Sequence, residues 1–327
     1  MITNTVLAQQ SMPSSLHIQS QVPLADKTWF KVGGPARFFC EPTSAAEFHQ
    51  AVAWAQEQRL AVFVLGEGAN ILISDAGFDG LVIRPALRNI LIHDGAEQSV
   101  MVTAEAGVSL PDLITFCLDK NILGLEEFSG IPGTVGGSVY INLHYFEFLL
   151  SQFLVSAQVV NRQTGQVQTM TNDWFNFGYN QSTLQAKEWY LLDATFKLRR
   201  CSDLEAAYAR GRRIEIIRHR VSRYPAKNTC GSFFRNFHND EVTVESNGKK
   251  MIYVAYYLDK IGVKGTLSVG GAVVSYQHAN MLVNKGNATS ADLVQLARAM
   301  QELVRQQFGI TPQPECILVG FDTYPLL

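Results

Sequence analysis

The stretch Gly130-Ile131-Pro132-Gly133-Thr134-Val135-Gly136-Gly137 decides the fold of this chain. Four of its eight residues are glycine, which tolerates positive φ and close backbone approach. Pro132 fixes one φ and removes one backbone donor. The pattern excludes a helix or a regular strand, and it predicts a loop that presents backbone N–H groups to a phosphate or a flat polar heterocycle. A tight turn between packed strands is the alternative.

A second glycine-rich segment, Gly66-Glu67-Gly68-Ala69-Asn70, directly follows the apolar run Val62–Leu65. Two such loops in one chain favour a dinucleotide ligand over a single phosphate. The candidate cofactor-binding residues come from these loops and from the residues directly after the second one: Gly66, Glu67, Gly68, Ala69, Asn70, Ile71, Leu72, Gly130, Ile131, Pro132, Gly133, Thr134, Gly136 and Gly137.

Composition narrows the class of protein. The 327 residues suffice for two or three domains at ~100–200 residues each, and 47% hydrophobic residues support a sizeable core. A net charge of -2 gives no electrostatic basis for binding nucleic acid. No apolar run reaches the ~20 residues of a membrane-spanning helix. We therefore expect no nucleic-acid or membrane partner. A monomer with a small-molecule substrate is a further expectation, which composition does not decide.

The cysteines and the N-terminus indicate the compartment. No CxxC pair occurs, so we expect no metal, neither zinc nor an iron–sulfur cluster. The cysteines are scattered and odd in number, which fits a reduced cytoplasmic protein. Residues 1–21 are rich in Ser and Gln and lack the basic start and apolar stretch of a signal peptide, so a flexible leader is expected there. The five cysteines are Cys40, Cys117, Cys201, Cys230 and Cys316.

Helices and strands alternate in the first half of the chain. A capping pattern at Ser44 and Glu47 predicts a helix through about Gln58 with Phe48, Ala51, Val52 and Ala55 buried. A second helix begins at Ser109. Buried or alternating apolar runs predict strands, the last two on either side of a turn at Thr164-Gly165. These strands are Val62–Leu65, Leu81–Arg84, Val100–Glu105, Val155–Val160 and Trp189–Leu198.

The remainder of the chain predicts a compact α+β unit. The basic segment Leu204–Arg220 favours a helix and lies at the expected domain boundary. Lys249–Ile261 is expected to be helical, and Val269–Asn284 has strand character. Thr289 opens the clearest helix of the chain, which ends at Gly309.

Seven motifs then occur in one order from about Leu24 to Gly320. Together they resemble UDP-N-acetylenolpyruvoylglucosamine reductases, also called UDP-N-acetylmuramate dehydrogenases. Each motif alone is weak, but the ordered set is specific. The motifs are Thr28–Ala36, Gly66–Asp75, Gly130–Gly137, Phe177-Gly178-Tyr179, Gly231–Asn236, His278-Ala279-Asn280, and Phe308–Ile310 with Pro314-Glu315.

The resemblance implies a fold and an activity. The fold would be α+β, with a leader at 1–21 and a two-subdomain FAD-binding domain of the vanillyl-alcohol-oxidase type at 22–202. A C-terminal α+β substrate-binding domain would follow at 203–327. The family is a flavoenzyme of bacterial cell-wall synthesis. In it, NADPH reduces FAD, and hydride then passes to the vinyl carbon of UDP-N-acetylglucosamine enolpyruvate, giving UDP-N-acetylmuramate.

Two positions match the family's catalytic residues. Ser232 matches the family's proton donor. A serine hydroxyl that is held in place can protonate a strongly basic carbanion. Glu315 matches a carboxylic residue that helps to stabilise the intermediate. In its apolar surroundings desolvation would raise its pKa and let it donate a hydrogen bond. A turn serine and a surface glutamate are the alternatives. Cys230 and Cys316 flank the pair as alternative acids or as small apolar filler.

Further positions match or adjoin the substrate side of the family. Asn236 and Arg223 match contacts to the UDP-sugar, and Lys227 is a rival for the role of Arg223. Tyr179 is expected near the flavin, with ordinary packing as the alternative, and His278 is either a substrate contact or a structural histidine. The candidate substrate-binding residues are Tyr179, Asn180, Arg223, Asn236 and His278.

The chain departs from the family pattern at three places. Asn180 stands where Phe-Gly-Tyr is followed by arginine, so the site loses a charge and a bidentate donor. Losing such a donor can cost on the order of 3 kcal/mol. Asn142–Glu147 reads Asn-Leu-His-Tyr-Phe-Glu where the family has Asn-Ala-Gly-Ala-Tyr-Gly. Phe237 replaces a proline.

Three hypotheses remain open from the sequence. The first is the reductase with a compensating cation, for which Arg223, Lys227 and Arg235 are the candidates. The second is a related flavin oxidoreductase that acts on a different sugar nucleotide or enol ether. The third is a non-catalytic flavin- or nucleotide-binding protein, which loss of both Ser232 and Glu315 would favour; both are present.

Overall fold

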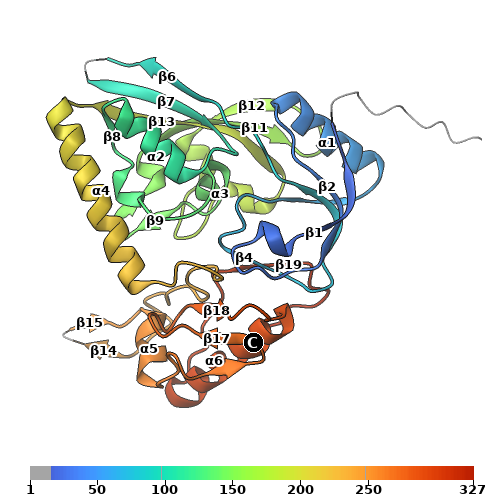
Figure 1. Ribbon diagram of the computed structural model, residues 1–327, viewed down its shortest axis with the longest axis vertical. Coiled ribbons are helices and arrows are strands. Elements are labelled where there is room, and N and C mark those ends of the chain that lie inside the picture. Colours follow the sequence, from blue (N-terminus) through green and yellow to red (C-terminus); the bar gives the residue numbers. More distant parts are fainter. Residues whose placement is uncertain (1–15, 97, 247) are drawn as a thin grey trace, which may run out of the picture.

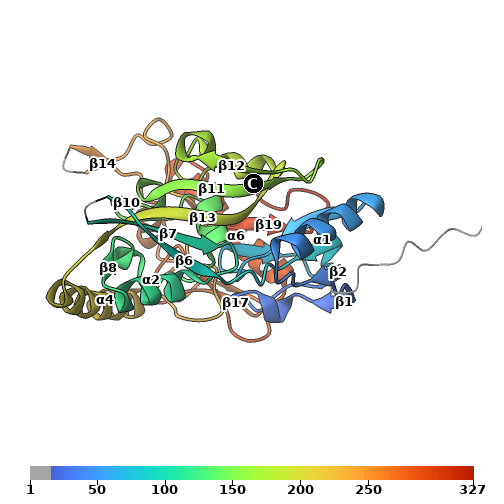
Figure 2. The ribbon, with the colours of Figure 1, turned by 90° about the horizontal axis from the view of Figure 1, so that it is seen from above.

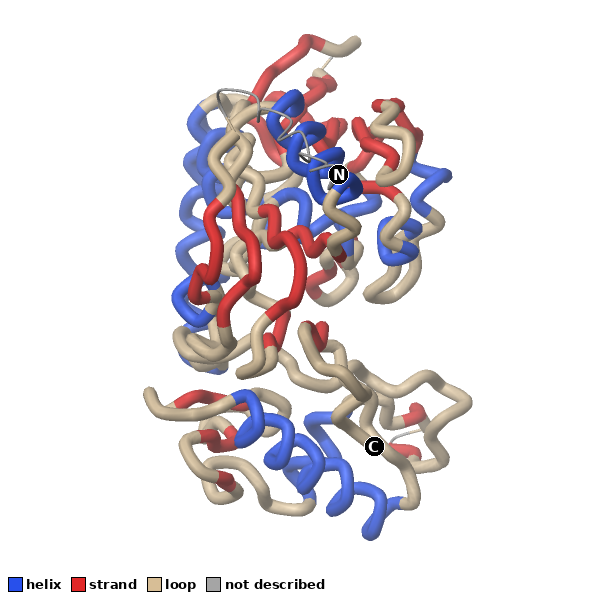
Figure 3. Tube along the Cα trace, turned by 90° about the vertical axis from the view of Figure 1, so that its right-hand side faces the viewer, coloured by secondary structure: helices blue, strands red, loops and turns tan. Residues whose placement is uncertain are grey.

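A computed structural model describes residues 16–96, 98–246 and 248–327. Figure 1 shows a larger part, which holds two sheets and helices α1 to α4, above a smaller part, which holds α5 and α6. Seen from above in Figure 2, α1 and α4 lie at opposite ends of the larger part. Figure 3 shows the smaller part as a separate layer beneath the larger one. No helix among the described residues is long and apolar enough to cross a bilayer.

The first sheet has the strand order β1-β2-β5-β3. β2, β5 and β3 are parallel, and β1 pairs antiparallel with β2. Helix α1 (Ala45–Glu57) packs on this sheet, and its predicted apolar face, Phe48, Ala51, Val52 and Ala55, is buried. The Ser44 side chain accepts from the Glu47 N–H, as the capping pattern predicts. The strands are β1 (Gln19–Pro23), β2 (Pro35–Cys40), β3 (Ala61–Val64) and β5 (Phe78–Ile83).

The leader expected at residues 1–21 is contradicted at residues 16–21. Residues 1–15 lie outside the described part of the chain. Leu16 is already buried against the first sheet, and Gln19 begins β1. The prediction was therefore wrong for these residues. Pairing of β1 with β2 satisfies the backbone hydrogen-bonding groups of β1, and the polar side chains of this segment give no sign of that pairing.

The second sheet has the order β12-β11-β13-β7-β6, and β8 also pairs with β13. Every pairing in it is antiparallel. Helices α2 (Leu110–Asp119) and α3 (Val135–Tyr140) share a buried core with its inner face. The strands are β6 (Ile90–Asp94), β7 (Ser99–Glu105), β8 (Ile122–Leu123), β11 (Leu154–Asn161), β12 (Val167–Thr171) and β13 (Trp189–Arg200).

The turn at Thr164-Gly165 does not connect the two strands that we expected. It joins β11 to β12, and β13 follows only after two short 3-10 helices. β12 escaped prediction because it is an edge strand with little apolar surface to bury. The 3-10 helices of the chain are Ala25–Lys27, Glu126–Phe128, Leu150–Gln152, Asn172–Phe175 and Thr183–Ala186.

Helix α4 (Asp203–Arg223) connects the two parts of the molecule. A capping box of Ser202 and Glu205 begins it. Ala209 belongs to the core of the second sheet, so the helix packs on the larger part. A boundary at residues 202 and 203 stays a prediction, and this packing favours a structural border at the other end of α4.

The smaller part is an α+β layer around α6 (Ser290–Phe308). Thr289 and Asp292 cap α6, and Gly309 ends it at a φ of 71°, as predicted. The expected helix at 249–261 is wrong at its start, because residues 249 and 250 form a hairpin strand and α5 begins only at Val254. The other elements are β14 (Glu245–Ser246), β15 (Lys249–Lys250), α5 (Val254–Lys260), β16 (Ser268–Val269), β17 (Ala272–Val274) and β18 (Leu282–Asn284).

Three contacts hold the two parts together. The last strand, β19 (Ile317–Val319), pairs in parallel with β4 (Ile71–Ile73) of the larger part. The Asp75 carboxylate accepts from the N–H groups of Ser290 and Ala291 at the start of α6. The buried Asn284 amide donates to the Phe30 carbonyl oxygen at 2.9 Å.

We expect Asn284→Ala to lower the free energy of unfolding by about 3 kcal/mol, because it leaves buried backbone groups without partners. Besides its bond to Phe30, Asn284 accepts from the N–H groups of Gly286 and Ala288. Urea denaturation measures the change. Asn287→Ala, at an exposed position three residues away, is the control. Its free energy of unfolding should stay within ~0.5 kcal/mol of wild type. Equal stability of the two variants would contradict the proposed link between the parts.

Candidate active site

A cavity with about 1230 Å³ of empty space, part of it open to solvent, lies between the glycine-rich segments. Residues from both sheets, from α3 and from β19 line it. Among the candidate cofactor-binding residues, its lining includes Gly66, Glu67, Gly68, Ala69, Asn70, Ile71, Pro132, Gly133, Thr134, Gly136 and Gly137.

Three of the candidate cofactor-binding residues lie outside this lining. Leu72 alternates with Ile71 along β4, so its side chain points the other way and is fully buried in the core of the smaller part. Gly130 packs against the side chain of Arg220 on α4. Ile131 packs at the edge of the core of the second sheet.

The two glycine-rich segments touch each other. The Glu67 carboxylate accepts from the Gly133 N–H at 3.0 Å. A Cβ atom on Gly66 would lie 2.8 Å from Thr134 Oγ1, closer than side-chain packing allows. A Cβ atom on Gly133 would instead meet nothing within 4 Å, and the φ of this residue is 133°. Glycine is therefore required at Gly66 for contact between the loops and at Gly133 for backbone conformation.

The prediction that 130–137 contains no helix is wrong for its second half. Thr134 caps α3, which begins at Val135 and so takes Gly136 and Gly137 into its first turn. Glycine costs about 1 kcal/mol in a helix interior, but the core around Val135 and Val139 compensates for it here. Within the described residues, the Gly136 N–H is already bonded to the Ala106 oxygen.

Unpaired donors gather at the other segment. No hydrogen bond within the described part of the chain uses the backbone N–H groups of residues 66–70. The Tyr190 hydroxyl, on a residue that lines the same cavity, is buried and has no hydrogen-bond partner within the described ranges. Buried polar groups are normally satisfied, so these donors fit a ligand rich in acceptors. The phosphates and the ring edge of a flavin dinucleotide are such acceptors.

Ser232 and Glu315 lie on adjacent extended segments of the smaller part. The Glu315 N–H donates to the oxygen of Phe233, the residue after Ser232, at 2.8 Å. Ser232 itself bridges to Met281, and Gly231 before it has a φ of 80°. The buried Asn280 side chain bonds both backbone groups of Phe234 and stiffens this segment. The backbone thus brings the two candidate catalytic residues to one place.

The Glu315 carboxyl is held in a desolvated position. Part of the residue reaches solvent, but protein atoms surround its carboxyl group, and this burial raises its pKa to about 7. Asn180 lies beside it and partly offsets the rise in pKa, although neither amide atom of Asn180 makes a well-formed hydrogen bond among the described residues. The Asn180 amide is therefore buried and free to bind a ligand.

Tyr179 lies near this acid, and Asn236 lies beside Tyr179. Burial raises the pKa of Tyr179 to about 12, with a further contribution from Glu315, and the nearby Asn236 lowers it slightly. The Tyr179 ring contacts the ring of His144 with 4.8 Å between centroids. Tyr179 and Asn180 therefore lie near Glu315, and Asn236 lies beside Tyr179.

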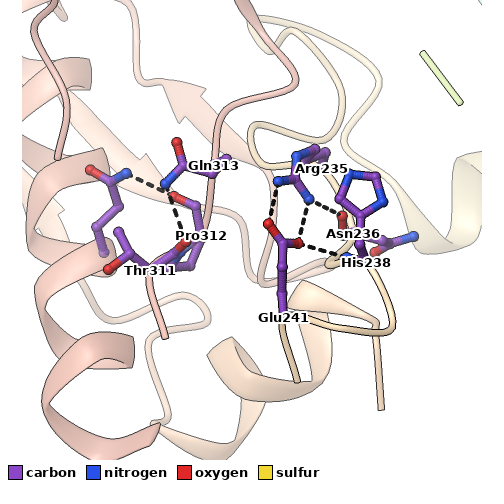
Figure 4. A network of polar contacts seen from close by, with 8 residues as sticks. Arg235, Asn236, His238, Glu241, Thr311, Pro312 and Gln313 are labelled. Carbon is purple, nitrogen blue, oxygen red and sulfur yellow. Dashed lines mark hydrogen bonds and ion pairs between the residues drawn. The ribbon is translucent and has the colours of Figure 1, made fainter. Parts of the chain in front are cut away.

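The candidate compensating cations differ in their surroundings. Arg235 makes a bidentate ion pair with Glu241, at 2.6 and 2.8 Å, which Figure 4 shows beside Asn236. Arg223 is exposed, and its guanidinium lies 3.5 Å from a ring nitrogen of His219. Lys227 is exposed as well. Arg235 is thus already neutralised, and the other two lie at the surface.

His278 is partly buried, and Cys230 and Cys316 are buried. Burial lowers the pKa of His278, whose Nδ1 accepts from the Asn280 N–H at 3.3 Å and whose ring contacts Tyr224. These bonds within the smaller part fit the structural interpretation of His278. Burial raises the pKa of Cys230 well above its ordinary value, with Cys316 next to it. A thiol held protonated in this way behaves as apolar filler.

Comparison with known proteins agrees with this geometry. Residues 36–171 match the FAD binding domain family, and residues 223–319 match the C-terminal domain of UDP-N-acetylenolpyruvoylglucosamine reductase. The UDP-N-acetylenolpyruvoylglucosamine reductase of Synechococcus sp. (strain RCC307) is 34% identical over 94% of this chain and 96% of its own length. That of Pediococcus pentosaceus is 32% identical over 91% of this chain and 93% of its own.

This chain belongs to the UDP-N-acetylenolpyruvoylglucosamine reductase family. The crystal structure of the reductase from Thermus caldophilus superposes with a TM-score of 0.74 at 26% identity, and it covers 93% of this chain and 100% of the other. The α+β fold with an FAD-binding domain and a C-terminal α+β domain is confirmed. The FAD binding domain match includes both glycine-rich segments, so FAD is the dinucleotide that the unpaired donors and the cavity fit.

Sequence reasoning missed several residues that lie in or near the candidate site. Tyr190 lies in a predicted strand, and nothing in the sequence marks its unpaired hydroxyl. His144 and Tyr145 form β9 (His144–Tyr145), which pairs with β10 (Phe148–Leu149) in a hairpin. Their only signal was the departure from the small residues of the family pattern. Arg220 gave no signal, because its neighbours come from distant segments.

Replacing Gly66 with valine should weaken FAD binding about tenfold or more, since overpacking against Thr134 costs ~1–3 kcal/mol and separates the two loops. Titration of the apoprotein with FAD, followed by flavin fluorescence, measures the dissociation constant. Gly211→Ala on α4 is the control, because a Cβ atom there meets open space. Unchanged FAD affinity in Gly66→Val would rule out this cradle.

Proposed function

We propose that this protein reduces UDP-N-acetylglucosamine enolpyruvate to UDP-N-acetylmuramate with NADPH and FAD, in peptidoglycan precursor synthesis and thus in bacterial cell-wall growth. The observation that carries the proposal is the backbone bond that sets the desolvated Glu315 beside the Ser232 segment. The relatives named above, which carry the reductase name over nearly the whole chain, support it.

The residues have distinct roles in this reaction. Bound FAD supplies the hydride that adds to the terminal vinyl carbon. The Ser232 hydroxyl gives its proton to the neighbouring carbon, where negative charge spreads into the substrate carboxylate. Protonated Glu315 donates a hydrogen bond to that carboxylate, and the Asn180 amide adds a second donor. Both groups are neutral, so burying them costs less than burying a charge.

The rest of the predicted setting completes the proposal. A cytoplasmic location fits five scattered free thiols, and we propose a monomer. Tyr179, Asn180, Arg223 and Asn236 are the proposed substrate-binding residues. For the fifth candidate, His278, we propose the structural role, because its Nδ1 accepts from the Asn280 N–H. A related flavin oxidoreductase with another enol ether as substrate is the second candidate, because Asn180 and the β9–β10 hairpin depart from the family pattern.

A half-reaction tests the function. The bound flavin is reduced without oxygen, UDP-N-acetylglucosamine enolpyruvate is added, and the return of the oxidised flavin band is followed. Rapid return establishes the reductase reaction. No return from a protein whose flavin is bound and reducible would exclude this substrate.

Changing Ser232 to alanine should leave flavin reduction by NADPH intact and slow flavin reoxidation by the substrate about 10²- to 10⁴-fold, because the proton donor is lost. Stopped-flow absorbance measures both half-reactions. Ser268→Ala, at an exposed position of the same part, should behave as wild type. Equal slowing of both half-reactions in Ser232→Ala would exclude a proton-donor role.

Flavin reoxidation should be constant below about pH 7 and fall about tenfold per pH unit above it. Desolvation raises the Glu315 pKa to about 7, so the proton that it donates is present below that pH and lost above it. Glu315→Gln keeps a donor that does not titrate, so its rate should be lower and lack the alkaline fall. A pH series on both proteins decides this. The same fall in the variant would assign it to another group.

A further inference from the structure

Arg220 occupies an unusual position on the last turn of α4, where the chain passes from the larger to the smaller part. Its guanidinium carbon lies 5.1 Å from the ring centroid of Tyr145 and 5.3 Å from that of Tyr224. Its Nε is buried and has no hydrogen-bond partner among the described residues. No acidic side chain in that part of the chain pairs with it. The rings of Tyr145 and Tyr224 thus hold the Arg220 guanidinium, which has no anionic partner in the described ranges.

Several other arginines of α4 and of the site have partners, and Arg223 lies at the surface. Arg212 pairs with Glu127, Arg218 with Glu215 and Arg235 with Glu241. Arg210 donates to the Leu118 carbonyl oxygen. A buried N–H group without an acceptor lowers the free energy of unfolding, because it has lost its hydrogen bonds to water. A planar guanidinium matches the two oxygens of a carboxylate or phosphate, so an anionic ligand would supply the missing acceptor.

Three contacts connect Arg220 to the candidate active site. Its stem packs on Gly130, at the start of the glycine-rich loop, where a Cβ atom would lie 3.2 Å from its Cδ. The ring of Tyr224 also contacts the ring of His278. Tyr145 belongs to the hairpin whose preceding residue, His144, contacts the Tyr179 ring.

The hairpin also explains how Arg220 is held here. Its first residues, His144 and Tyr145, stand where the family pattern has Gly and Ala, and Tyr145 supplies one of the two rings that hold Arg220. Asn180, at the position of the family arginine, is neutral and lies beside Glu315. Asn180 and the hairpin, the two departures from the family pattern, therefore border the same site. Asn180 removes a cation from it, and the hairpin holds the cation of Arg220 near it.

We propose that Arg220 binds an anionic oxygen group of the substrate, either the diphosphate or the carboxylate; bound to the carboxylate, it would also supply the cationic donor that is missing at Asn180. This proposal rests on the proposed function for the identity of the substrate. The shared chemistry is a bidentate bond from a guanidinium, stiffened by two tyrosine rings, to two oxygens of one anion.

Two probes applied to the FAD-loaded protein separate the two sources of the anion. UDP-N-acetylglucosamine carries the diphosphate without the carboxylate, and its dissociation constant is measured by calorimetry. UDP-N-acetylglucosamine enolpyruvate carries both, and its apparent dissociation constant comes from the concentration dependence of flavin reoxidation. Arg220→Gln is compared with Arg218→Gln, which removes an exposed cation two residues away on the same helix. Thermal unfolding shows whether each variant remains folded.

Arg220→Gln should weaken binding about 10- to 100-fold, the factor typical of a lost hydrogen bond to a charged group. Weaker binding of both probes assigns Arg220 to the diphosphate, and weaker binding of the enolpyruvate alone assigns it to the carboxylate. Arg220→Lys keeps the charge but not the fork, so it should lie between wild type and Arg220→Gln. Tyr145→Leu should weaken the same probe about two- to fivefold, whereas Tyr145→Phe keeps the ring and should not.

Binding of both probes at wild-type strength by folded Arg220→Gln or Arg220→Lys would overturn the proposal. A different outcome would overturn the proposed function alone: the wild-type protein binds UDP-N-acetylglucosamine, but the enolpyruvate does not reoxidise its flavin. In that case the first probe still decides whether Arg220 binds a phosphate. A wild-type protein that binds neither probe would refute both proposals.

Discussion

One backbone hydrogen bond sets the geometry on which the candidate active site depends. The Ile317 N–H donates to the Asn70 oxygen at 3.0 Å and so begins the parallel pairing of β19 with β4. Asn70 ends a glycine-rich segment of the cavity, and Ile317 follows Glu315 by two residues. Glu315 is in turn bonded through its own N–H to Phe233, next to Ser232. A continuous ladder therefore runs from the cofactor loop to both candidate catalytic residues.

A strand pair of three residues is too short to be stable alone, so neighbouring contacts must support it. The Ser74 N–H extends the ladder by donating to the Val319 oxygen at 2.9 Å. Asp75, the next residue, accepts from the first N–H groups of α6, where a carboxylate also suits the helix dipole. Asn284, the last residue of β18, adds a buried hydrogen bond to the Phe30 carbonyl oxygen. Relative motion of the two parts would have to break these bonds together, so the site is held in register.

The sequence predicted what local chemistry determines. The helices α1, α2, α4 and α6 each begin at a serine or threonine whose side chain caps the first turn, and their apolar spacing marks the buried face. It failed where the deciding partner is distant. β12 is a strand only because β11 lies beside it, and residues 249–250 leave the expected helix because they pair with β14. A glycine pair enters α3 because the core around it provides the packing that glycine lacks.

The candidate site was predictable in its motifs and not in its charges. Ser232, Glu315 and both glycine-rich segments were found from the ordered motifs, and the backbone gathers them as the resemblance implied. The sequence could not show which arginine is available to a ligand. Arg235 is paired because Glu241 lies beside it, and the surroundings of Arg220 come from three separate segments. Long-range pairing decides whether an arginine is structural or available to a ligand.

The neutral Asn180 changes how the site can handle negative charge. An arginine beside Glu315 would favour the ionised carboxylate and lower its pKa, whereas Asn180 leaves desolvation dominant and the acid protonated up to about pH 7. The φ of Asn180 is 54°, in a region where asparagine is among the least strained side chains, so the turn itself suits the exchange. A protonated Glu315 donates a hydrogen bond but carries no charge. The negative charge of the intermediate then needs one cation placed elsewhere, and the hairpin that holds Tyr145 against Arg220 also sets His144 against Tyr179. The two departures from the family pattern are in this way parts of one rearrangement of the site.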